Sequence, residues 1–308
     1  MANVLSEEKT LAIIRCLVEG NSIRSIERIT GASRNTVMKV LVRFGNACEE
    51  YLDARLNNLP LEHVQMDEIW TFVGKKESKL THREKREGEK GSQYLFLGID
   101  TTTKLIASYR LGKRTFATTK DFVDDLEGRL HRAPDTMGNQ RPQVSTDGWP
   151  SYVPTIETAF RGEVRHGVLI KNYRDPAVGR YAPPEMTRAT RINIKNVESD
   201  RSICTSHIER HNLTIRTFLK RFTRLSLGFS KKVENLRAAI SLHVAYYNFC
   251  WRLREKGTSG KLTPTPAQQI GIEEERWSVE KLVETVTDFQ EYQEVVRRAA
   301  ALARRLGL

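Results

Sequence analysis

Apolar residues recur at helical spacing over residues 6–56, which predicts a helical N-terminal segment. Within it, residues 21–44 predict two helices around a tight turn, with Gly31 in the turn and Ser33 as the N-cap of the second helix. Four polar residues remain on or near the outer face of that helix: Arg34, Asn35, Thr36 and Lys39. This layout is typical of a helix-turn-helix, whose second helix enters the major groove of DNA. An ordinary three-helix packing unit is the alternative.

After Pro60 the pattern changes to the alternation of strands. Strands are expected at 63–73, 94–100, 104–112, 142–149 and 163–170. An amphipathic helix is expected at 118–131, and a long helical region at 206–254. Two segments lack a regular pattern: the charged stretch 75–93 is expected to be an exposed loop, and 171–205 an irregular insertion.

This order of elements predicts an α/β fold: an RNase H-like mixed five-stranded sheet with flanking helices, preceded by an all-α helix-turn-helix domain. We expect a DNA-binding domain at 1–58 and a catalytic domain at 59–256, the latter carrying the insertion near 171–205. A charged helical tail is expected at 257–308.

Net charge supports a polyanionic partner. The 308 residues include 50 Lys and Arg against 38 Asp and Glu, a formal charge of +12, and nucleic acid is the usual partner of so basic a protein. No apolar run approaches the roughly 18 residues of a membrane span, and the first residues lack the pattern of a signal peptide. We therefore expect a cytoplasmic protein with no membrane partner. The four cysteines are scattered singly, which favours neither a zinc ribbon nor a disulfide framework.

Three acidic residues are candidates for a metal site. Asp67 lies mid-strand among apolar neighbours, where a carboxylate is costly unless it is paired or binds a metal. Asp147 ends an apolar strand before Gly148, and Glu209 lies in an expected helix. Mg²⁺ and Mn²⁺ prefer hard oxygen ligands, so carboxylates from separate elements must converge to hold them. An edge-strand Asp, a plain Asp-Gly turn and a surface Glu–Arg pair are the alternative readings of the three.

Other acids compete with these three. Asp100 also ends an apolar strand, but the residues after it predict a hairpin turn. Glu198 and Asp200 compete with Glu209 but lie in a segment without a helical apolar face. Glu68 neighbours Asp67 in the strand and is expected to point to the opposite face.

Three motifs together resemble the DDE transposases of bacterial insertion sequences, most nearly the insertion-sequence-one group. They are MDEIWTFVGKK, STDGWPSY and HIERHNLTIRTFLKRFTRLSLGFSKK, in this order, and the resemblance covers roughly residues 5–270. It implies an RNase H-like domain with Asp67, Asp147 and Glu209 as the catalytic and metal-binding acids. It further implies two Mg²⁺ ions, replaceable by Mn²⁺. The cysteine zinc module that members of this group often carry before the helix-turn-helix is not visible here.

The helical segment around Glu209 is strongly basic. Seven basic residues and no acid lie between 210 and 232, which favours contacts to phosphate over a merely solvated face. Asn212 and Arg216 follow Glu209 at i+3 and i+7, on the same helix face. The residues expected to contact DNA in this segment are Arg210, Asn212, Arg216, Lys220, Arg221 and Arg224.

The combined expectation is a nucleoid-associated transposase that cleaves and joins strands at terminal inverted repeats and target DNA. Because strand transfer requires both transposon ends together, we expect a homodimer or larger assembly. Two alternatives are a related metal-dependent nuclease or integrase, and a helix-turn-helix regulator derived from a transposase.

Overall fold

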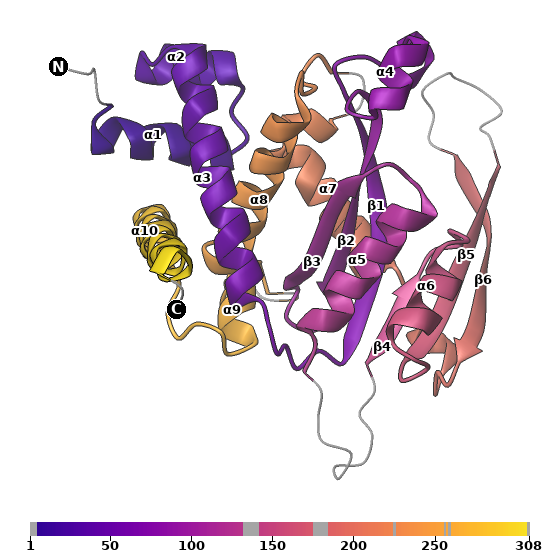
Figure 1. The fold of residues 1–308 in the computed structure, drawn as a ribbon. Coiled ribbons are helices and arrows are strands. Elements are labelled where there is room, and N and C mark those ends of the chain that lie inside the picture. The colour runs from indigo at the N-terminus through magenta and orange to yellow at the C-terminus, as the bar shows by residue number, and fades with distance from the viewer. Residues whose placement is uncertain are drawn as a thin grey trace. The chain divides into compact units, whose positions relative to one another are not determined.

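The computed structural model describes residues 5–131, 142–174, 184–223, 226–255, 257 and 260–306. The chain divides into two compact units. Unit 1 comprises residues 1–56, 71–92 and 215–308, and unit 2 comprises residues 57–70 and 93–214. Figure 1 shows the helices and strands of both units along the colour-coded chain.

Unit 1 is mainly helical. Its helices are α1 (Glu7–Val18), α2 (Ile23–Thr30), α3 (Arg34–Arg55), α4 (His82–Glu87), α8 (Val233–Phe249), α9 (Pro266–Gln269) and α10 (Val279–Leu306). As expected, α2 ends at Gly31, whose φ of 67° is the left-handed conformation that glycine adopts at low cost. Ser33 caps α3, since its side chain accepts a hydrogen bond from the backbone N–H of Thr36.

The core of unit 1 lies where α3 packs against α8. Gly45 on α3 lies so close to α8 that an added Cβ would meet the backbone of Ala238 at 2.3–2.6 Å. Further along α3, the ring of Tyr51 contacts Phe249 on α8, at a centroid distance of 5.8 Å, and Phe289 on α10, at 5.5 Å. The N-terminal helices are therefore built onto the C-terminal helices of the same unit.

The charged stretch expected as a loop is ordered instead. It contains the 3-10 turn η1 (Glu77–Lys79) and α4, whose N-terminus has a capping box formed by Thr81 and Glu84. The Glu84 carboxylate also binds Lys75 and Lys90, each at 2.9 Å. These hydrogen bonds, led by the one from Lys75, lower the pKa of Glu84. In the sequence these charged residues suggest a solvated loop. In the structure Lys75 and Lys90 pair with the single carboxylate of Glu84.

Over the described residues the sheet has six strands rather than the expected five, in the order β3-β2-β1-β4-β5-β6. The strands are β1 (His63–Val73), β2 (Gly91–Asp100), β3 (Ile106–Gly112), β4 (Gln143–Thr146), β5 (Arg165–Arg174) and β6 (Glu185–Lys195). β4 pairs in parallel with both β1 and β5, whereas β2–β3 and β5–β6 are antiparallel. The mixed α/β class is confirmed. β1 and β2 each run from one unit into the other, as does α7 (Ser206–Phe218).

The sixth strand comes from the segment expected to be an irregular insertion. β6 is exposed along nearly its whole length and pairs only with β5, so it has no buried face to produce an apolar alternation in the sequence. After it, Val197 and Ile203 are buried with Leu169 of β5 and hold the segment against the sheet.

Two helices of unit 2 cover one face of the sheet (Figure 1). α5 (Phe116–Arg129) matches the expected helix and buries Phe122, Val123 and Leu126. α6 (Tyr152–Ala159), between β4 and β5, was not expected. In the part of the chain that the structure describes, no helix is long and apolar enough to cross a membrane.

Candidate metal centre and nucleic-acid interface

Adjacent parallel strands bring Asp67 and Asp147 together. In the β1–β4 ladder, Met66 is the partner of Thr146, and each aspartate is the residue that directly follows one of these two in the chain. β4 ends at Thr146, so Asp147 leaves the sheet where β1 continues. Asp67, Glu68 and Asp147 each place a carboxylate oxygen within 4.8 Å of the others. Among the described residues this is the one group of three or more possible metal ligands.

The pKa of Asp67 is strongly raised in this cluster. Burial raises its pKa to about 7, and the charges of Asp147, Glu68 and Glu209 add to the rise. Two hydrogen bonds hold the carboxylate: Oδ1 accepts one from the backbone N–H of Glu68 at 2.9 Å, and Oδ2 one from the side-chain amide of Asn212 at 2.8 Å. No lysine or arginine pairs with Asp67 among the described ion pairs, so a bound cation would relieve the repulsion.

Asp147 is fixed by the turn that follows it. Its Oδ1 accepts a hydrogen bond from the backbone N–H of Trp149 at 2.9 Å, an Asx-type arrangement that orients the carboxylate. Its Oδ2 lies 3.8 Å from the guanidinium of Arg114. Burial raises the pKa of Asp147 and the charge of Glu209 adds to the rise, while the Trp149 N–H and Arg114 act in the opposite direction.

Glu209 lies on α7 and is not one of the three acids within ligand distance of one another; the N-terminus of α7 is anchored to β1. The side-chain oxygen of the buried Gln65 accepts hydrogen bonds from the backbone N–H groups of His207 and Ile208, at 2.9 and 3.0 Å. The first N–H groups of a helix lack partners within it, so Gln65 acts as a cap supplied by another element. Sequence reasoning missed this residue.

The Glu209 carboxylate has two partners of its own. Its Oε1 accepts a hydrogen bond from the Thr205 hydroxyl at 2.5 Å and forms an ion pair with Lys171 of β5. Its side chain remains 43% exposed, and its charge raises the pKa of both aspartates. The three acids predicted from sequence therefore influence one another electrostatically in the folded chain.

Glu68 belongs to the acidic group although its side chain was expected to point to the opposite face of β1 from Asp67. Asp67 is held by Asn212 of α7, whereas Glu68 binds residues of other elements and still places a carboxylate oxygen within 4.8 Å of those of Asp67 and Asp147. It accepts a hydrogen bond from the Tyr152 hydroxyl at 2.9 Å and forms an ion pair with Arg114. The side chain is only 3% exposed, and burial, followed by the charge of Asp147, raises its pKa.

Arg114 is a further site residue that sequence reasoning missed. It follows β3 and binds Glu68 while also approaching Asp147. Its guanidinium carbon lies 4.2 Å from the centroid of the Trp149 ring, a cation–π contact that keeps the side chain in place. The Trp149 indole in turn donates to the Thr119 hydroxyl at 3.1 Å. Trp149 thus packs against Arg114.

The rival acids serve other purposes. Asp100 is buried and its Oδ2 accepts hydrogen bonds from the backbone N–H groups of Thr102 and Thr103, which closes the predicted hairpin turn. Glu198 forms an ion pair with Arg165 at 2.8 Å, and Asp200 begins the 3-10 turn η2 (Asp200–Ser202).

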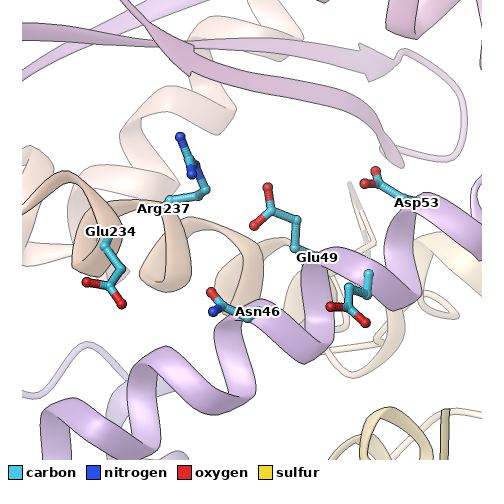
Figure 2. Close-up of a pocket in the computed structure, with 6 residues that line it drawn as sticks. Asn46, Glu49, Asp53, Glu234 and Arg237 are labelled. Carbon is cyan, nitrogen blue, oxygen red and sulfur yellow. The ribbon is translucent and has the colours of Figure 1, made fainter. Parts of the chain in front are cut away.

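An acidic hollow separate from this cluster lies in unit 1, lined by residues of α3 and α8 (Figure 2). Its volume is about 350 Å³. Figure 2 shows the residues that line it: Asn46, Glu49 and Asp53 from α3, and Glu234 and Arg237 from α8. Their carboxylates do not converge to within ligand distance of one another, so the hollow is not a metal centre of the kind formed by Asp67, Glu68 and Asp147.

The residues expected to contact DNA have different environments. Arg34, Asn35 and Lys39 are exposed at the start of α3, with Thr36 half-buried, and Arg34 pairs with Glu27 at 3.3 Å. On α7, Arg210 is exposed and Arg216 half-buried. Asn212 is buried against Asp67, so it belongs to the acidic cluster. Arg224 lies outside the described residues.

A groove of about 760 Å³ in unit 1 joins two of these groups. Arg34 and Asn35 line it from the start of α3, and Lys220 and Arg221 from η3 (Lys220–Phe222). Lys220 is exposed. Arg221 instead donates to the Ser230 hydroxyl at 2.6 Å, and burial lowers its pKa to about 10. Arg24 and Lys231 also line the groove, and none of the described residues that line it is acidic.

Comparisons with known proteins agree with the resemblance seen in the motifs. The family model described as IS1 transposase matches residues 187–249, which include Glu209 and Asn212. The chain is 29% identical over 175 residues to the insertion element IS1 protein InsB of Shigella sonnei, covering 56% of this chain and 85% of that protein. The insertion element IS1 9 protein InsB of Escherichia coli K12 is 29% identical over the same length, and the match spans 66% of it.

A solved structure of piggyBac transposase in a synaptic complex with hairpin DNA aligns with 93% of this chain and 72% of its own. The TM-score is 0.38 at 11% identity, which does not establish a shared fold. The sequence matches confirm the predicted resemblance to bacterial insertion-sequence transposases and support a transposase as the class of protein.

Proposed function

We propose that the chain is a metal-dependent DDE transposase with Asp67, Asp147 and Glu209 as its acidic triad. The observation that carries the proposal is the crowding of carboxylates around Asp67, whose pKa of about 7 reflects burial and three neighbouring acids. Folding does not by itself favour such crowding, because like charges in a shielded site repel. Clusters of this kind are characteristic of functional sites.

The donor set suits Mg²⁺ or Mn²⁺, because every candidate ligand is a carboxylate oxygen and no cysteine or histidine belongs to the cluster. Asp67, Asp147 and Glu209 would hold the ions, with Glu68 as an additional acid beside them. When bound, such ions supply positive charge to the scissile phosphate and activate a water or hydroxyl nucleophile.

The protein's own residues prepare this site. Asn212 orients Asp67, the Trp149 N–H and Arg114 orient Asp147, and Thr205 orients Glu209. The order of strands, α5, further strands and α7 supports the RNase H-like prediction, with β6 as an addition at the edge. In this proposal the basic groove of unit 1 binds the terminal repeats, with α1–α3 as a helix-turn-helix.

The test is strand cleavage of labelled DNA taken from both flanks of the gene, with Mg²⁺ present. We expect Asp147→Asn and Glu209→Gln to reduce cleavage by more than the 10–100-fold typical of residues that support metal ligands, while DNA binding is kept. Glu198→Gln is the matched control, since Glu198 lies outside the cluster. Equal cleavage by parent and Asp147→Asn would remove Asp147 from the mechanism. Binding without any cleavage by the parent would favour a regulator.

A further inference from the structure

The C-terminal helix α10 has two halves with different environments. Its first half belongs to the core of unit 1, where Leu282 and Val286 are buried and Phe289 contacts Tyr51. From Glu291 onward nearly every described side chain is exposed. This second half nevertheless carries large apolar residues: Tyr292 is 64% exposed, Val295 63% and Leu302 58%.

These apolar residues form one stripe. Tyr292 and Ala299 are seven residues apart, as are Val295 and Leu302, which is the alternating three-and-four spacing of a coiled-coil seam. At 3.6 residues per turn the stripe lies about a third of a turn away from the face that carries Leu282. It is therefore a second face, separate from the one packed in the core.

The charges beside the stripe indicate how a second helix would lie against it. Glu291, Arg298 and Arg305 recur every seven residues along one flank of the seam. In a parallel pair this flank would face the opposite flank, which carries Val296 and Ala303 and offers no ion pair. In an antiparallel pair centred on Arg298, Glu291 would face Arg305 of the partner subunit, and this pairing would occur twice.

Arg298 lies at the centre of that antiparallel arrangement, and its charge is already compensated within its own helix. Arg298 forms an ion pair with Glu294 of the same helix at 3.1 Å, which offsets the repulsion between two copies of Arg298 at a two-fold axis. A surface that is complementary to itself in this way is what an isologous dimer requires.

We propose that residues 291–305 of α10 are a self-association surface on which a second copy of this chain packs antiparallel. The apolar stripe supplies the buried seam, and the Glu291–Arg305 pairs select the antiparallel orientation. This inference does not depend on the acidic cluster.

Sedimentation of the full chain without DNA, at micromolar concentration, tests the surface. We expect twice the 35.3 kDa mass of one chain, and a single-chain mass for Val295→Lys combined with Leu302→Lys. Leu227→Lys is the matched control, because Leu227 is an apolar residue 95% exposed elsewhere in unit 1, and it should stay dimeric. Circular dichroism checks that each variant is folded. A monomeric parent, or a dimer unaffected by the double lysine variant, overturns the proposal.

A charge exchange tests the orientation. Glu291→Arg places arginine against Arg305 of the partner subunit, and Arg305→Glu places glutamate against glutamate, so each should raise the dimer dissociation constant by about tenfold. The double exchange should restore it to within about threefold of the parent. Additive weakening in the double variant, or single variants that dimerise like the parent, would overturn the antiparallel arrangement.

Discussion

The side-chain amide of Asn212 donates a hydrogen bond to the carboxylate of Asp67 at 2.8 Å, joining the helix of the third acid to the strand of the first. Asn212 lies one turn after Glu209, so one contact sets the position of two acids. We expect Asn212→Ala to weaken Mn²⁺ binding and Mg²⁺-dependent cleavage by about 10–100-fold. Calorimetric titration of Mn²⁺ measures the first effect. Leu213→Ala, at an exposed neighbouring residue, should match the parent.

Asp67 should destabilise the metal-free protein at neutral and alkaline pH. Its pKa rises from 3.8 to about 7 on folding, so the folded state binds more protons between these values and loses stability as the pH increases through this range. Asp67→Asn should therefore raise the melting temperature at pH 8, by about 2–4 °C per kcal/mol for a chain of this size. At pH 4, where the folded carboxyl is already protonated, the difference should nearly vanish. A variant that melts below the parent at pH 8 would contradict this account.

Arg114 should stabilise the fold by compensating the charge of Glu68. Removing one partner of a shielded ion pair leaves the other uncompensated, which costs more than removing both. With the guanidinium side chain 36% exposed, we expect Arg114→Gln to cost about 1–2 kcal/mol of unfolding free energy, a value below that of a fully buried pair. The double variant with Glu68→Gln should recover part of this loss. Urea unfolding at pH 7.5 measures all three variants. A double variant less stable than Arg114→Gln would refute the compensation.

His243 should make the protein sensitive to acid. It is buried on α8 among aromatic rings, and burial lowers its pKa to about 4. Since the unfolded imidazole takes up a proton near pH 6.5 and the folded one does not, stability contributed by the neutral form is lost as the pH falls from about 6.5 to 4. His243→Leu should flatten the fall in unfolding free energy between pH 7 and 5. The exposed His82, changed to Leu, serves as the control.

Lys220 and Arg221 should differ although both line the basic groove. Lys220 is exposed, and its replacement by Ala should reduce the slope of log affinity against log salt by about one unit at most. Arg221 donates to Ser230, so Arg221→Ala should mainly lower the melting temperature. Binding titrations at several salt concentrations, with melting curves, separate the two. An unchanged salt slope for Lys220→Ala would exclude this residue from DNA contact.

The site role of Asp67 and Asp147 was predicted from the resemblance of their motifs to DDE transposases, and the parallel pairing of β1 with β4 places the two residues side by side. The turn role of Asp100 and the cap at Ser33 could be predicted because each depends on a few adjacent residues. Turns and helix caps of this kind can be predicted from the residues next to them in the sequence.

Other features depend on partners that are remote in the chain. Tyr152 and Arg114 hold Glu68 in the acidic group, and Gln65 caps a helix that begins more than a hundred residues later. Ile29 continues the helical spacing of Ile23 and Ile26 in α2 but is 63% exposed. β6 has no buried face and therefore left no periodic signal. Periodicity along the sequence reports which side of one element is buried, whereas these features depend on contacts between elements.

The close packing at Gly45 limits how this protein can vary. Any side chain there would have to force two backbones apart, and the affected helix is the one that begins at Arg34. In the proposed function, the exposed residues at the start of α3 can change together with the DNA sequence that they contact. Gly45 cannot be replaced in this way, because a larger residue there would displace the helix that carries them.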